Sequence, residues 1–109
     1  MNHRSTHNIK AKQKNYRPGI VVIEGHVQGL ANTRLLGQAG IPVIVIDKDD
    51  CIAQYSKYCK AFYKCPDYLS EEFIDFLIRL NKAFNLQNWI IIPLLENLYP
   101  SIKKCFKQI

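Results

Sequence analysis

The chain has 109 residues and a mass of 12.6 kDa, the size of one domain. Its 48% hydrophobic and 22% charged residues are the balance of a globular domain, which excludes disorder over most of the length and collagen-like repeats. The net charge of +6 is concentrated in the first 19 residues, which hold five basic and no acidic side chains. We therefore predict a flexible basic arm over residues 1–18 and one domain over residues 19–109. We expect no nucleic-acid partner, with contact between the arm and a phosphate backbone as the less favoured alternative.

The N-terminus has no apolar signal segment, and the longest apolar run, residues 89–95, is far shorter than the ~20 residues of a membrane helix. We expect a cytoplasmic protein without a membrane partner. The four cysteines have no CxxC spacing, and His26 is the one histidine outside the arm. This pattern predicts reduced structural cysteines and no metal site.

In chain order, residues 20–23 form a β-branched run that is typical of a strand covered on both faces. Residues 25–29 form a glycine-framed loop. Residues 30–39 predict a helix with Ala31, Leu35 and Ala39 on one face, in which Gly37 allows close packing on the sheet. Gly40 and the following residues up to Pro42 form a strong helix stop.

Residues 43–46 predict a second buried strand, and residues 51–58 one or two helical turns. Residues 61–65 alternate between polar and apolar, which indicates an edge strand. Ser70 is a good N-cap for an amphipathic helix with one apolar stripe, made of Phe73, Phe76, Leu77, Leu80 and Phe84. Residues 89–92 predict a fourth strand, and a final helix is expected to begin near Asn97.

This alternation predicts an α/β fold, an open parallel four-stranded sheet with helices on both faces. Ligands of such sheets bind outside the carboxyl ends of the strands, where the strand order reverses. If the second and third strands lie on one side of the first strand and the fourth on the other, the reversal lies between the first and fourth strands. The loops that border it are residues 25–29 and 93–97.

The first loop reads Gly25-His26-Val27-Gln28-Gly29, and we predict that these five residues bind the substrate. Its spacing, GxxxGxA, departs from the dinucleotide fingerprint GxGxxG, so it is a weak signal for NAD. The glycines still allow a tight turn, and the helix start offers N–H groups to an anion. A plain strand-to-helix turn that needs glycine for its backbone is an equally supported interpretation.

Two acids complete the predicted substrate-binding set. Asp47 ends the second strand at about the 20-residue spacing at which dinucleotide-binding folds hold a ribose hydroxyl. A solvated acid at the strand end is the alternative. Glu96 lies in the loop after the fourth strand, where it would contact the ligand or complement the dipole of the next helix. No catalytic residue is predicted, because no Ser or Cys nucleophile lies near His26 in the sequence.

Residues 19–109 resemble the N-terminal (pre-ATP-grasp) domain of ATP-grasp carboxylate–amine ligases, which include D-aspartate-ligase-like and carbamoyl-phosphate-synthase-like proteins. The resemblance lies in IVVIEGHVQGLANTRLLGQAGIPVIVIDKD, in Ser56-Lys57-Tyr58 followed by a strand and Pro66, and in Pro93 followed by Glu96. It implies a Rossmann-like domain in which the loop of residues 25–29 and Glu96 face a small carboxylate or amine substrate. Ser56 and Tyr58 would shape the wall of the site.

By the same resemblance, ATP and Mg²⁺ bind to a separate ATP-grasp domain, so this chain alone holds no cofactor. We expect a fragment that is inactive by itself and that self-associates through the face left by the missing domain. The alternative is a free-standing Rossmann-like module that binds a nucleotide or small metabolite without catalysis. A receiver-like signalling domain fits poorly, because the third strand ends in Cys65-Pro66 without a phosphoacceptor Asp. A longer reading frame in the source genome would favour the ligase over the free-standing module.

Overall fold

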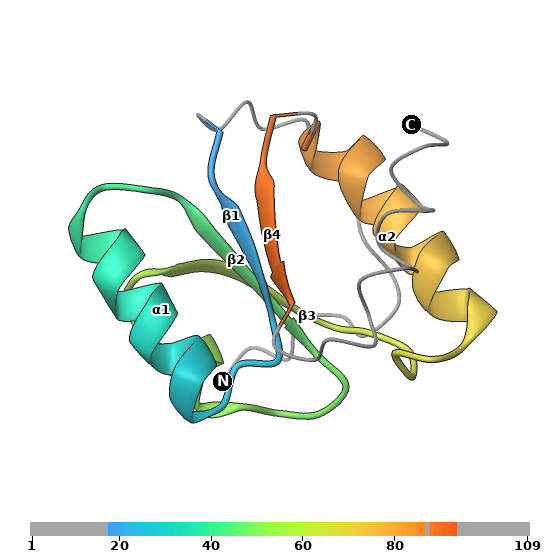
Figure 1. The fold of residues 1–109 in the computed structure, drawn as a ribbon, viewed down its shortest axis with the longest axis horizontal. Helices are drawn as coiled ribbons and strands as arrows, with labels where there is room; N and C mark the ends of the chain where they lie inside the picture. The colour runs from blue at the N-terminus through green and yellow to red at the C-terminus, as the bar shows by residue number, and fades with distance from the viewer. Residues whose placement is uncertain (1–17, 87, 94–109) are drawn as a thin grey trace.

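A computed structural model describes residues 18–86 and 88–93 of the chain. Four strands form one parallel sheet in the order β3-β2-β1-β4, and helices cover both of its faces (Figure 1). The elements in chain order are β1 (Ile20–Ile23), α1 (Val27–Gln38), β2 (Val43–Asp47), the 3₁₀ helix η1 (Ile52–Tyr55), β3 (Cys59–Lys64), α2 (Glu71–Phe84) and β4 (Ile90–Pro93). The predicted α/β fold class is confirmed.

The two interior strands are the predicted β-branched runs. Every residue of β1 and β2 is buried, and Ile20 pairs with Val43 on one side and with Ile90 on the other. Strands covered on both faces have no solvent side, which is why their sequences do not alternate. Strand β3 lies at one edge, as its alternation predicts, and β4 lies at the other. The strand order therefore reverses between β1 and β4, as expected.

Helix α2 packs its apolar stripe on one face of the sheet. Its N-cap Ser70 accepts a hydrogen bond from the Phe73 backbone N–H at 3.3 Å. The predicted stripe residues are all buried, and they pack with alternate strand residues such as Val21 and Ile44. On the other face, η1 and parts of α1 cover a second cluster that includes Val22, Val45 and Phe62. Successive residues of β1 and β2 thus point alternately into the two clusters, as side chains of a strand do.

The prediction for α1 is wrong in its start and in its buried face. The helix begins at Val27, three residues earlier than expected, and Leu35 is 68% exposed. The helix instead buries Gly29 and Thr33. The Thr33 hydroxyl donates to the Gly29 carbonyl at 2.7 Å, which satisfies the polar group without solvent. A Cβ at position 29 would clash with the Glu24 carbonyl oxygen, so the small residue permits the close approach.

The predicted stop of α1 is confirmed as a Schellman motif. Gly40 has a φ of 83° and donates to the Gly37 carbonyl at 2.9 Å, while Ile41 donates to the Leu36 carbonyl at 3.1 Å. Gly37 was expected to allow packing on the sheet. A Cβ there would instead clash with the side chain of Tyr58, which precedes β3. Gly37 therefore accommodates this neighbouring loop.

The predicted final helix near Asn97 lies outside the described residues, as do residues 1–17 of the predicted arm. Neither of the two α-helices in the described ranges has the length and apolar content that crossing a bilayer requires.

The two helices yield a matched test of the core. Leu80 on α2 is fully buried and Leu35 on α1 is exposed. We expect Leu80→Ala to lower the free energy of unfolding by about 2–5 kcal/mol, because it removes buried methyl groups and leaves a cavity. Leu35→Ala should change it by less than about 0.5 kcal/mol. Urea unfolding measures both, and equal losses would contradict the assignment of faces.

Candidate functional site

The candidate site begins where β1 ends, at the carboxyl edge of the sheet. Glu24 has a φ of 75°, and Gly25 after it is buried. The Gly25 carbonyl accepts a hydrogen bond from the Ala53 N–H at 2.9 Å. A Cβ on Gly25 would clash with Cys51, Ala53 and Val45. Packing alone therefore requires glycine here, which is the plain-turn interpretation of this residue.

Asp47 at the end of β2 fixes this loop. Its side chain is only 4% exposed, and its Oδ2 accepts a hydrogen bond from the Gly25 N–H at 3.0 Å. Its Oδ1 accepts from the Asp49 N–H at 3.1 Å and from the Tyr68 hydroxyl at 3.5 Å. Asp47 is thus not a solvated strand-end acid. Both of its oxygens have protein partners, so its place in the candidate site is to hold the loop that carries the exposed residues.

His26 is the polar side chain that this arrangement presents to solvent. It occupies the N-cap of α1, and its Nε2 lies 3.5 Å from Asp47 Oδ2, with the imidazole 56% exposed. When the imidazole is protonated, this contact is an ion pair in which His26 is the exposed partner and Asp47 the buried one. The His26 side chain makes no capping hydrogen bond to the helix.

The first turn of α1 follows directly, with Val27 and Gln28 exposed and Gly29 buried. The N–H groups of a first helical turn have no intrahelical partner and carry the positive end of the helix dipole. The structure therefore brings five predicted residues and Asp47 to one place at the β1 end of the strand reversal. Glu96, the remaining predicted site residue, lies outside the described residues.

Sequence analysis missed Tyr68, which lies in the segment between β3 and α2. It is buried at the same edge, its ring stacks edge-on against Phe73, and Lys48 Nζ lies 5.3 Å above it. Burial and the nearby Asp47 charge raise the pKa of Tyr68 well above its usual range. The phenol is therefore neutral and donates to Asp47. Its position after Pro66, at the end of a strand, was the available signal.

The two buried cysteines near this edge are packing residues. Burial, reinforced by the Asp47 charge, raises the pKa of Cys51 to about 11 and that of Cys65 to about 12. Both thiols are therefore neutral at physiological pH. Among the residues that the structure describes, no three His, Cys, Asp or Glu side chains gather as metal ligands would.

Comparisons with protein-family models, with curated proteins and with solved structures found no significant match. The relationship to ATP-grasp ligases therefore rests on the sequence resemblance and stays a prediction. Function has to be inferred from the fold and from the chemistry of the carboxyl edge.

Asp47→Asn tests the role of the buried carboxylate. Each Asp47 oxygen faces a donor, so in either orientation the amide NH₂ of Asn would meet another N–H or O–H. We expect a loss of about 1–3 kcal/mol in the free energy of unfolding. The control Asp49→Asn changes an exposed neighbour and should cost less than about 0.5 kcal/mol. A stable Asp47→Asn protein would show that these contacts do not hold the loop.

The raised thiol pKa values predict slow alkylation. Raising the pKa of Cys51 from 9.0 to about 11 lowers its thiolate fraction at about pH 8 by roughly 100-fold. Iodoacetamide should therefore modify Cys51 and Cys65 at least that much more slowly in the folded chain than in urea, with rates that rise as the pH approaches 11. Mass spectrometry of the separate peptides measures this. Equal rates in folded and unfolded protein would contradict it.

Proposed function

We propose that this domain binds a small carboxylate metabolite at the carboxyl edge between β1 and β4, as the substrate-side domain of an ATP-dependent carboxylate–amine ligase. The observation that carries the proposal is the pairing of exposed His26 with buried Asp47 at the start of α1, beside the strand reversal. The loop of residues 25–29, which the resemblance assigns to the substrate, occupies this place. We further propose a cytoplasmic location.

The chemistry of this edge favours an anion. The first-turn N–H groups of α1 present partial positive charge, and a protonated His26 would add a full charge beside them. Asp47 offsets part of the His26 charge, because the two side chains lie 3.5 Å apart. Its oxygens already accept hydrogen bonds from Gly25, Asp49 and Tyr68, so the groups that face solvent here are donors. A ligand carboxylate would thus accept hydrogen bonds from the helix start and from the imidazole.

In this proposal each residue has a positional task. Asp47 orients His26 and fixes Gly25, while His26 and the amides of Val27 and Gln28 hold the ligand. Glu96 would border the ligand from the β4 side, as the resemblance implies. ATP and Mg²⁺ would bind to an ATP-grasp domain, as the resemblance implies. There ATP would phosphorylate the carboxylate and leave as ADP, and an amine would then form the amide bond by displacing inorganic phosphate.

Amide NMR spectra of the full chain, titrated with aspartate, glutamate and succinate at constant ionic strength, test this binding. We expect saturable shifts confined to residues 24–30 and their neighbours at the end of β2. His26→Ala should weaken binding by about tenfold or more, the cost of a hydrogen bond to a charged group. Lys82→Gln, which removes an exposed charge from α2, should have no effect.

Three results would count against the proposal. Amide shifts that vary with ionic strength and are equal in His26→Ala and Lys82→Gln would indicate a general charge effect and no specific site. Absence of any shift at residues 24–30 at millimolar ligand would remove the carboxylate site. Specific binding in a chain whose gene encodes no ATP-grasp domain would instead establish the free-standing module and reject the ligase.

A further inference from the structure

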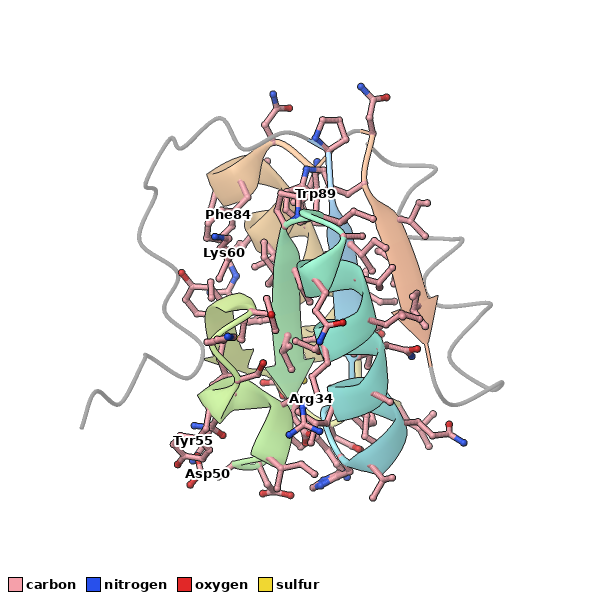
Figure 2. All side chains as sticks on the ribbon, turned by 90° about the vertical axis from the view of Figure 1, so that its left-hand side faces the viewer. Arg34, Asp50, Tyr55, Lys60, Phe84 and Trp89 are labelled. Carbon is pink, nitrogen blue, oxygen red and sulfur yellow. The ribbon has the colours of Figure 1, made fainter. Side chains whose placement is uncertain are left out.

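A hollow lies on the α1 face of the sheet, away from the start of α1. It is a pocket of about 320 Å³ between the second half of α1 and the segment that leads into β3. Two cationic side chains, one hydroxyl, one amide and one phenol line it, namely those of Arg34, Lys57, Ser56, Gln38 and Tyr58. Figure 2 looks onto α1 and shows Arg34 on the side of the helix where η1 and β3 lie.

A smaller hollow of about 80 Å³ adjoins the pocket and shares Lys57 and Tyr58 with it. Lys60 of β3 lines this hollow, together with the glycines and Ile41 at the end of α1. Three cationic side chains therefore border one continuous depression. None of the described residues that line either hollow is acidic.

The cations of this depression lack acidic partners among the described residues. The ion pairs among the described residues involve His26, Lys48 and Lys64 as cations. None of them involves Arg34, Lys57 or Lys60. Lys57 Nζ lies instead 5.2 Å above the Tyr58 ring. Like charges gathered without counter-charges repel one another, and a bound anion would relieve this repulsion.

The wall that carries these groups is fixed. Tyr58 packs on α1 where Gly37 has no side chain, and its backbone N–H donates to Ser56 Oγ at 3.1 Å. The Ser56 carbonyl accepts from the Cys59 N–H at 3.0 Å. Because Ser56 Oγ accepts in this turn, its O–H remains able to donate into the pocket. The Ser56 hydroxyl is held by this turn, so it loses little conformational entropy when it binds a ligand.

We propose that this pocket binds the phosphate group of a small phosphorylated metabolite. Arg34 can donate two parallel hydrogen bonds to phosphate oxygens, Lys57 and Lys60 supply point charges, and Ser56 adds a hydroxyl donor. The volume of about 320 Å³ exceeds that of a phosphate group alone and leaves room for the attached organic part. None of its lining residues belongs to residues 24–30 or to Asp47, so the pocket is separate from the carboxylate site. Ser56 and Tyr58, which the resemblance assigns to the wall of the substrate site, line this pocket instead.

Amide NMR spectra of the full chain test the pocket with three probes at constant ionic strength: inorganic phosphate, glycerol phosphate and acetate. We expect saturable shifts at Gln38, Ser56 and Tyr58 with both phosphates and none with acetate. Tighter binding of glycerol phosphate would show that the organic part is recognised as well. Equal affinity for inorganic phosphate would reduce the site to a receptor for the free ion and reject the metabolite.

Arg34→Gln and Lys57→Gln should each weaken phosphate binding about tenfold, because each removes a charge-assisted hydrogen bond. Both side chains are exposed, so the fold should survive, and thermal unfolding verifies this. Lys82→Gln on the opposite face is the matched charge control, and His26→Ala should leave phosphate binding unchanged. Equal effects of all four variants would overturn the proposal. So would shifts confined to residues 24–30, or binding of a nucleic-acid duplex through these residues in preference to glycerol phosphate.

Discussion

The carboxylate of Asp47 is the contact on which the carboxyl edge of this domain depends. It lies at the end of an interior strand and accepts hydrogen bonds from its own turn at Asp49 and from two other segments, the loop after β1 at Gly25 and the segment before α2 at Tyr68. A buried carboxylate is costly unless its oxygens are paired, and here both are. One side chain therefore fixes the relative positions of the loops on both faces of the sheet.

The exposed loop at the start of α1 and the pocket lined by Arg34 and Lys57 lie toward opposite ends of this helix. At its start, the helix dipole and His26 favour an anion, while at its end the carbonyl groups of the last turn favour cations nearby. Arg34, Lys57 and Lys60 gather near that end. The Schellman motif satisfies part of the terminal carbonyl groups through Gly40 and Ile41, so the basic side chains are not all required to cap the helix.

The sheet and α2 could be predicted because their sequences repeat with the period of the structure. Helix α1 could not be oriented correctly, since its apolar residues Val27 and Leu35 face solvent while Gly29 and Thr33 pack inward. The hydrophobic periodicity of the sequence does not predict this packing. It depends on the missing side chain of Gly29 and on the hydrogen bond from the Thr33 hydroxyl to the Gly29 carbonyl. The position of the candidate site followed from strand order. The burial of Asp47 depends on Tyr68, distant in sequence, and no local pattern reveals that pairing.

The crowding around Gly25 and Gly29 also bears on how ligand preference can change during evolution. A side chain at either position would clash with atoms of neighbouring strands and turns. Both positions therefore require glycine as long as the backbone keeps this path. The three intervening residues, His26, Val27 and Gln28, point outward and can be exchanged without repacking the interior. A change in the ligand preference proposed for this loop would therefore come from these three side chains, with the backbone between Gly25 and Gly29 unchanged.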